Sequence, residues 1–467
     1  MSGGGMMATF LALMVSGLPV AMAMAGAALI YVMLSGDLPD FVVIHRMYGG
    51  VDSFPLLAVP FFIWAGNLMN SAGITNRIYN FALALVGWLK GGLGHVNVVG
   101  SMIFAGMSGT AIADAAGLGT IEIKAMKDHG YSTEFAVGVT AASATVGPII
   151  PPSLPFVIYG MMAGVSIGQL FLAGVIPGIL MGITMMLTVA YFAHTRNYGR
   201  DVPFSASKLF KASLEIVIVG ALPTAIWLLW KLGMPGGWAT ILVFGLLLAL
   251  DRFFNFSAVM ALLTPVLLIG GMTMGVFTPT EGAIVASLWA LFLGLFWYRT
   301  LDWRRLVKIT MDTIETTATV LFIVAAASIF GWLLTVTRVT DAVAEWVLAF
   351  THDPNMFLLL ANLLMLFVGC FLEPVAAITL LVPILIPICV KLGIDLVHFG
   401  LVMVLNLMIG LLHPPMGTVL FVLSRDAKLS FEATTIAILP WLVPLLITLG
   451  LCTFIPTIVL WLPKQFF

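Results

Sequence analysis

The chain has 467 residues, of which 61% are hydrophobic and only 9% are charged, and its mean hydropathy is +1.12. A soluble domain carries about 25% charged residues, so this composition excludes an ordinary water-soluble protein. The formal net charge of −1 argues against nucleic acid as a partner. Charge-free runs at 135–195 and 433–463 instead predict helices in a lipid bilayer, because a span needs roughly 20 mostly apolar residues.

Hydropathy and helix-breaking residues predict an all-helical polytopic protein. The segment 6–34 is expected to form one retained first span, since it is longer than the core of a signal peptide and lacks a basic start. The segments 97–130 and 340–390 are expected in several pieces. The remaining predicted spans lie near 55–73, 76–95, 132–163, 168–195, 213–231, 237–250, 257–276, 282–298, 316–336, 395–423 and 432–461.

An internal repeat is the most informative feature of the sequence. With an offset of 263 residues and no gap, Gly106 aligns with Gly369, Gly147 with Gly410, and Pro151-Pro152 with Pro414-Pro415. Backbone geometry dictates where glycine and proline stand, so shared apolar composition does not explain the match. Gly130 and Ser132 should end one helix and cap the next, and Gly393 and Asp395 occupy the equivalent places.

The charged flanks of the two copies differ in sign. Basic loops follow the first copy, at 196–211, and precede the second, at 299–308, and the positive-inside rule places both in the cytoplasm. The region before the first copy, 36–53, carries three aspartates. Equivalent segments are therefore expected in opposite orientations, which is the inverted-topology repeat of secondary transporters.

Each copy is predicted to contain two breaks in its helices. The first is a stretch of small residues, Gly106–Thr120, matched by Gly369–Pro383. The second is a proline-interrupted helix, Thr145–Pro155, matched by Asn406–Gly417. Broken backbone at membrane depth is tolerated only where protein buries it or where it lines a wet cavity.

Polar residues lie inside these breaks, and their oxygen atoms are ligands that suit a small alkali cation. Asp114 and Glu373 are the carboxylates nearest the predicted tips; the alternative for both is a capping or network role. Glu122 and Lys124 are expected to mark the aqueous end of their segment, and His413 to be structural. The polar residues of the breaks are Ser108, Thr110, Asp114, Ser143, Thr145, Ser153, Glu373, Asn406 and Thr418.

Sequence signatures of common enzymes are missing, including HExxH, G-x-S-x-G and the Walker A loop. The chain is thus expected to be no enzyme, to need no cofactor and to use no ATP itself. Thr278-Pro279-Thr280-Glu281 has the spacing of a capping box and should start the span at 282–298.

Several segments of the chain resemble the large membrane subunits of TRAP (tripartite ATP-independent periplasmic) transporters, the DctM-like family. The resemblance covers nearly the whole chain. It is carried by GLPVAMAMAG (17–26), DSFPLLAVPFFIWAGNLMN (52–70), AGMSGTAIADAAGLGTIEIKAMKDHGY (105–131), TAASATVGPIIPPSLPFVIYG (140–160), GVFTPTEGA (275–283), FLEPVAAITLLVPILIP (371–387) and GLLHPPMGTVLFV (410–422).

The resemblance implies an elevator-type secondary transporter with two re-entrant hairpins and two broken helices. It implies sodium-coupled uptake of an organic anion, usually a carboxylate, across the bacterial inner membrane. A periplasmic binding protein would deliver the anion, and a small four-helix membrane subunit would pair with the scaffold. The implied divisions are a first scaffold segment (1–95), a first transport repeat (96–195), a central scaffold (196–316), a second scaffold segment (317–356) and a second transport repeat (357–467).

Two sets of residues follow from the breaks and from the resemblance. The expected substrate-binding residues are Ser108, Gly109, Thr110, Pro151, Pro152, Ser153, Pro415 and Thr418. The expected sodium ligands are Ser108, Ser143, Thr145, Gly147, Glu373, Asn406 and Gly410. A stand-alone anion/sodium symporter remains the alternative, and a membrane enzyme acting on a lipid-linked substrate is disfavoured because the polar residues form symmetric pairs.

The segment 211–256 departs from the family pattern, because two apolar runs flank Gly233–Gly237 where a single helix is expected. We predict that it forms two extra spans. A cysteine at Gly236 should then react with a membrane-impermeant maleimide from the periplasm, and one at Asn255 from the cytoplasm. Labelling of both from one side would reject the extra hairpin.

Overall fold

The computed structural model describes residues 2–36, 38–233, 242–243, 245–249, 259–273, 276–414 and 417–467. Within these ranges every named element is a helix, and the only strand-like pairing is an isolated bridge between Lys90 and Arg200. In the described part of the chain, six helical segments are long and apolar enough to cross a membrane: Phe54–Ser71, Ile167–Thr195, Pro279–Trp297, Trp303–Val336, Pro374–Lys391 and Phe431–Phe454. The predicted all-helical polytopic architecture is confirmed.

The amino-terminal stretch forms two helices, α1 (Gly3–Val15) and α2 (Val20–Ser35), which pack against each other. The expectation of one span over 6–34 is therefore wrong. Gly17 adopts a positive φ of 91°, and Pro19 lacks the amide hydrogen that a continuous helix needs. A single helix of this length would also exceed the roughly 30 Å hydrocarbon core. The short helix α3 (Phe41–Val51) follows and lies along α16.

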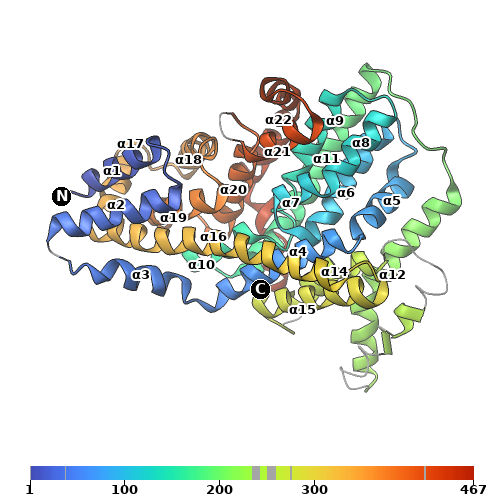
Figure 1. Cartoon of the computed structure of the whole chain (residues 1–467), viewed down its shortest axis with the longest axis horizontal. Helices are drawn as coiled ribbons and strands as arrows, with labels where there is room; N and C mark the ends of the chain where they lie inside the picture. Colours follow the sequence, from blue (N-terminus) through green and yellow to red (C-terminus); the bar gives the residue numbers. More distant parts are fainter. Residues whose placement is uncertain are drawn as a thin grey trace.

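One side of the molecule is built around the long helix α16 (Trp303–Val336), which is about 51 Å long at 1.5 Å per residue. Figure 1 shows it running across much of the molecule. It contacts α2, α3 and α4 (Ala58–Ser71). The other described helices outside the two sequence repeats are η1 (Phe54–Leu57), α5 (Ile74–Val86), α12 (Ala206–Lys231), α14 (Val259–Thr273), α15 (Pro279–Phe292), η2 (Leu293–Trp297) and α17 (Val339–Phe350).

Both sequence repeats contain, in the same order, a helical hairpin, a broken helix and a long helix, although the second arm of the first hairpin is divided into two helices and the second repeat ends in two additional short ones. The first comprises α6 (Gly92–Ser108), α7 (Ala111–Ala116), α8 (Leu118–Asp128), α9 (Thr133–Ala144), α10 (Leu154–Ala163) and α11 (Ile167–Thr195). The second comprises α18 (Pro354–Gly369), α19 (Pro374–Lys391), α20 (Leu396–Gly410), α21 (Thr418–Ala427), α22 (Phe431–Phe454), α23 (Pro456–Leu460) and α24 (Pro463–Phe466). The helices break at both double-proline blocks, as predicted.

The predicted helix caps are present at equivalent places in both repeats. Gly130 and Gly393 have φ of 82° and 68°, values that favour glycine. Two residues later, the side chains of Ser132 and Asp395 accept hydrogen bonds from the first turns of α9 and α20. The Thr278–Glu281 capping box is also formed, and it starts α15.

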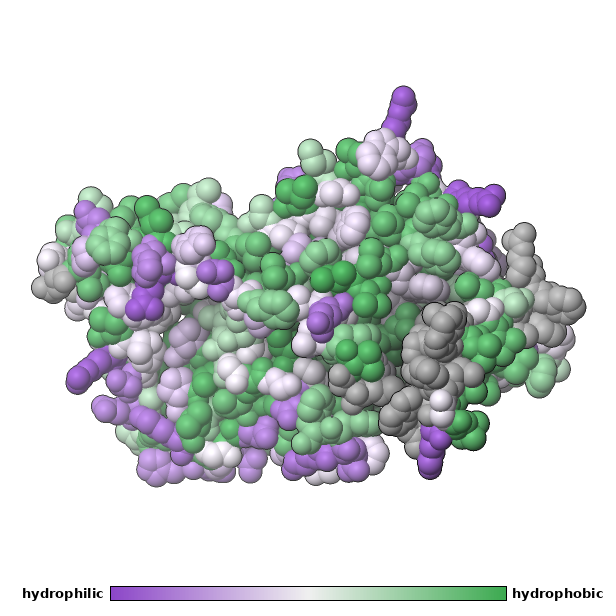
Figure 2. All heavy atoms as spheres, turned by 90° about the horizontal axis from the view of Figure 1, so that it is seen from below, coloured by the Kyte–Doolittle hydropathy of each residue, from purple (hydrophilic) through white to green (hydrophobic). Residues whose placement is uncertain are grey.

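The outer surface matches a membrane environment. Figure 2 shows hydrophobic side chains covering much of one face, with hydrophilic ones mostly toward its edges. Large apolar side chains such as Leu187, Ile314 and Val443 are exposed on different helices. A continuous apolar surface of this kind is stable when lipid covers it.

Only part of the predicted extra hairpin falls among the described residues. Helix α12 covers the first predicted span, 213–231, and packs against α5 and α14. Of the second span, residues 242–243 and 245–249 are helical. The connecting residues, including Gly236, and the following stretch with Asn255 lie outside the described residues. The hairpin therefore stays a prediction.

The hairpin formed by α18 and α19 approaches α20 through two glycines. A Cβ atom built on Gly410 would lie 2.8 Å from the Cα atom of Gly369, closer than real side chains come. We expect Gly410→Ala to lower stability by about 1–3 kcal/mol, because backbone has to move. Gly450→Ala is the matched control in α22, where nothing lies within 4 Å of the added atom. Melting temperatures in detergent should fall for Gly410→Ala alone; equal melting temperatures would contradict the close contact.

Candidate transport site

A cavity of about 350 Å³ lies where all four predicted breaks meet. It is lined by the start of α7 and the start of α19, by the α9–α10 break and the start of α10, and by the end of α20 with the residue that follows it. Helices α4 and α16 form the opposite wall. The lining residues are Ile63, Gly66, Asn67, Asn70, Gly109–Ala113, Ala116, Pro148, Leu154, Pro155, Thr316, Val320, Glu373–Val375, Met408 and Leu411.

The tip of the first hairpin is pressed against the first broken helix. Gly109 has a φ of 63°, and a Cβ atom there would lie 2.9 Å from the Pro152 carbonyl oxygen. Thr110 caps α7 by accepting a hydrogen bond from the Ala113 amide, and its carbonyl lies against Gly147. The predicted residues Gly109, Thr110, Gly147 and Pro152 are thus brought together, with their main-chain atoms in contact range.

The second tip offers a carboxylate. Glu373 is partly buried, directly precedes α19, and makes no side-chain capping bond to that helix. Its capping role, one alternative that the sequence left open, is therefore absent. The Glu373 side chain lines the cavity instead, together with Pro374 and Val375.

The wall formed by α4 and α16 adds polar groups that the sequence analysis did not select. Asn67 donates a hydrogen bond of 3.0 Å to Thr313, and Asn70 accepts one of 3.2 Å from Thr75. Thr316 lines the same cavity. The signal was present in the sequence: Asn67 and Asn70 stand three residues apart in an otherwise apolar helix, so they share one face.

Ser143, an expected sodium ligand, belongs to a buried hydrogen-bond network between α6 and α9. Its Oγ donates to Asn97 Oδ1 at 2.7 Å and accepts from Ser101 Oγ at 3.1 Å. Asn97 Nδ2 donates to Thr140 Oγ1 at 2.7 Å and to Glu122 Oε2 at 2.6 Å. Glu122 is only 1% exposed, so the expectation that it marks an aqueous end is wrong, whereas Lys124 is exposed.

Asn406, the repeat equivalent of Ser143, has an analogous network between α18 and α20. Its Nδ2 donates to the Oδ1 and the main-chain oxygen of Asn362, at 2.8 and 3.0 Å. Asn362 in turn donates to Thr453. The Oδ1 atom of Asn406 is buried and has no hydrogen-bond partner among the described residues. It is therefore free to bind a ligand.

Several other predicted residues, namely Thr145, Pro151, Ser153, Gly410 and Thr418, are not among the residues that line the cavity. Ser153 caps α10, and Thr145 Oγ1 donates to the Ala142 carbonyl at 2.6 Å. Gly410 ends α20 against Gly369, and Thr418 begins α21 with a buried hydroxyl. Pro151 precedes Pro152 in the α9–α10 break. Only the main chain of Ser108, which ends α6, is described, and Pro415 lies outside the described residues.

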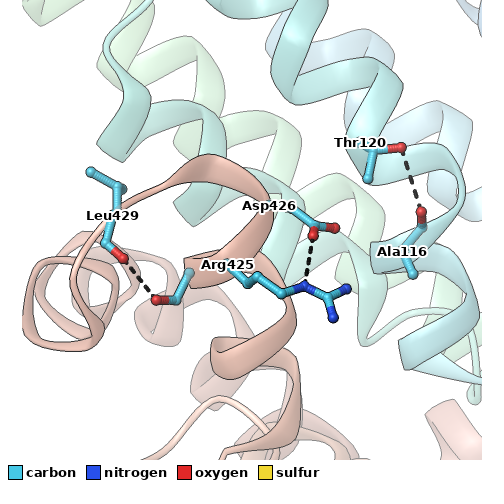
Figure 3. Close-up of polar contacts among 6 residues, drawn as sticks. Ala116, Thr120, Arg425, Asp426 and Leu429 are labelled. Atoms are coloured by element: carbon cyan, nitrogen blue, oxygen red, sulfur yellow. Dashed lines mark hydrogen bonds and ion pairs between the residues drawn. The ribbon is translucent and has the colours of Figure 1, made fainter.

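His413 and α21 have structural contacts. His413 Nδ1 lies 3.1 Å from the Ile409 carbonyl oxygen, which agrees with a structural role. Helix α21 packs beside α7 and α8, and Figure 3 shows its Arg425–Asp426 ion pair together with the bond from the Thr120 hydroxyl to the Ala116 carbonyl. Arg425 is largely exposed, so this pair adds little stability.

Comparisons with known proteins agree with this geometry. Residues 7–458 match the family described as the tripartite ATP-independent periplasmic transporter, DctM component. The chain is 43% identical to the sialic acid TRAP transporter large permease protein SiaM of Vibrio cholerae, covering 98% of this chain and 97% of SiaM. It is 31% identical to the C4-dicarboxylate TRAP transporter large permease protein DctM of Rhodobacter capsulatus, covering 97% of each chain.

Two solved structures share the fold at low sequence identity. The YdaH transporter of Alcanivorax borkumensis has a TM-score of 0.55 at 14% identity, covering 91% of this chain and 88% of YdaH. MtrF of Neisseria gonorrhoeae has a TM-score of 0.55 at 10% identity, covering 91% and 84%. With the family match over nearly its whole length, the chain is a multi-pass membrane transporter rather than an enzyme, and it belongs to the DctM component family, the large permease subunits of tripartite ATP-independent periplasmic transporters.

Proposed function

We propose that this permease takes up an organic anion, a carboxylate, by sodium-coupled secondary transport with an elevator mechanism. The observation that carries the proposal is that one cavity is bordered by both hairpin tips and by both helix breaks. Broken helices expose main-chain oxygens and helix ends, which bind cations and anions respectively. The relatives named for sialic acid and C4-dicarboxylate support a carboxylate substrate.

The anion would bind beside the amino-terminal end of α10. Leu154 and Pro155 at that end line the cavity, and the helix dipole there favours negative charge. Thr110 supplies a hydroxyl on the facing tip. We place the substrate near the first hairpin, with Ser108, Gly109, Thr110, Pro151, Pro152 and Ser153 as its surroundings, and we propose Thr418 and Pro415 of the second repeat as further contacts.

Sodium would occupy the two broken-helix regions. At the first, we propose main-chain and hydroxyl oxygens of Ser108, Thr145 and Gly147; Ser143 would contribute only if its bonds to Asn97 and Ser101 rearrange. At the second, we propose Glu373, Gly410 and the unpartnered Oδ1 of Asn406. A cation beside Glu373 would also offset repulsion between that carboxylate and an anionic substrate in the same cavity.

We propose an elevator mechanism because the cavity is lined by the two repeats on one side and by helices α4 and α16 on the other. Residues 96–195 and 357–467 would form the moving domain as inverted repeats with re-entrant hairpins. The segments 1–95, 196–316 and 317–356, which include α4 and α16, would form the scaffold. A small four-helix subunit and a periplasmic binding protein would complete the transporter in the bacterial inner membrane. The words tripartite and periplasmic in the family name support three components and a periplasmic one.

Uptake should depend on a sodium gradient and not on ATP. Proteoliposomes would contain this chain with its small subunit, and the binding protein would deliver radiolabelled carboxylates. Imposing a sodium gradient should start uptake, and collapsing the gradient with a sodium ionophore should stop it. Uptake that follows ATP and ignores the gradient would refute the proposal. Equal uptake by this chain without its partners would favour the stand-alone symporter.

Substitutions in the two regions should differ in their main effect, because Ser108 is proposed to contact both substrate and sodium, whereas Asn406 is proposed to contact sodium alone. Ser108→Ala should raise the KM for substrate about 2- to 12-fold, since one hydrogen bond contributes about 0.5–1.5 kcal/mol. Asn406→Ala should mainly raise the sodium concentration needed for half-maximal uptake. Thr448→Ala is the control, because Thr448 is buried in α22 and bonds to Thr184 and Pro444. Normal sodium dependence of a correctly inserted Asn406→Ala protein would show that the second-site assignment is wrong.

A further inference from the structure

Two carboxylates are buried behind the first hairpin tip, away from the cavity lining. Asp114 on α7 and Glu122 on α8 are each 1% exposed. Both carboxylate oxygens of Asp114, and Oε1 of Glu122, have no hydrogen-bond partner among the described residues. No described lysine or arginine forms an ion pair with either group.

These oxygens converge on one stretch of α6. Glu122 Oε1 lies so close to Gly100 that a Cβ atom built there would be 2.8 Å from it. The Asp114 carboxylate lies close to the hydroxyl of Ser101, the residue after Gly100, and its negative charge repels that of Glu122. The Ser101 hydroxyl donates its hydrogen to Ser143, so it offers a lone pair, and no hydrogen, to this region.

Buried negative charge without a partner is costly, by several kcal/mol for each ion. A membrane-embedded carboxylate is therefore expected to have a specific counter-charge. The available groups are all oxygens: carboxylate oxygens from two helices and a hydroxyl from a third. Oxygen ligands of this kind suit a hard alkali cation.

We propose that Asp114, Glu122 and Ser101 form a further sodium site, separate from the two sites at the helix breaks. The site lies between α6, α7 and α8, so its ion would hold the two arms of the first hairpin together. Its role in transport rests on the proposed sodium coupling, whereas binding of the ion does not depend on any substrate or partner chain.

The test measures sodium binding to the purified full-length chain. Equilibrium binding of ²²Na⁺ should lose one bound ion in Asp114→Asn and in Glu122→Gln, or weaken it about tenfold or more, because each change removes a charged ligand. Asp128→Asn is the matched control, since Asp128 is exposed at the end of α8. Ser101→Ala serves as a milder variant that keeps both carboxylates, should either amide variant fail to fold.

Melting temperatures in sodium chloride and in choline chloride give a second readout. Without sodium, the amide variants should melt higher than the natural chain, because they remove unpaired buried charge. Sodium should stabilise the natural chain and Asp128→Asn, and stabilise the amide variants less. If sodium binding and the sodium-dependent rise in melting temperature are unchanged in the amide variants, the proposed site is wrong. If, in addition, the melting temperature depends on pH in the natural chain but not in the amide variants, a proton rather than sodium neutralises the two carboxylates. Because the assay contains sodium alone, failure of anion uptake would not affect its result.

Discussion

The architecture depends on one constraint: main-chain groups at membrane depth need protein partners. The double prolines at 151–152 and 414–415 prevent continuous helices, and the broken backbone is covered by the hairpin tips. The hairpin tips can cover the broken helices only where the two main chains come into direct contact. Gly109 meets the Pro152 carbonyl and Gly369 meets Gly410, at separations that leave no room for a Cβ atom. The cavity lies where these two contacts meet the wall of α4 and α16.

The two halves share a backbone plan but differ in polar chemistry. In each, an asparagine on the first arm of the hairpin bonds to the equivalent position of the broken helix: Asn97 to Ser143, and Asn362 to Asn406. These bonds fix the hairpin to the broken helix within each repeat. The first repeat adds the buried Asp114 and Glu122, whereas the second presents Glu373 directly to the cavity. Similar scaffolds thus carry their carboxylates in different places, behind the hairpin tip in the first repeat and at the cavity in the second.

The effect of a charged group on stability depends on whether the group is buried. A carboxylate at a water-exposed helix end has little effect on stability, as for the exposed pair Arg425–Asp426. The same group packed between α6 and α8 requires a counter-charge. The α6–α9 network has no described charged donor, because Asn97, Ser101, Thr140 and Ser143 are all neutral. The proposed further sodium site therefore lies in the same hairpin that borders the proposed substrate site.

Apolar runs, glycines and prolines act locally, so the membrane class, the 263-residue repeat and the positions of the four breaks could be predicted from the amino-acid sequence. The same breaks pointed to Gly109, Thr110 and Glu373, which line the cavity. Long-range packing controls the remaining features, which became known from the folded chain. It buried Glu122, whose neighbour Lys124 stays exposed, and it added Asn67 and Asn70 from a distant helix. It also divided residues 6–34 into two helices that pack on each other, since local hydropathy does not reveal a turn at Gly17–Pro19.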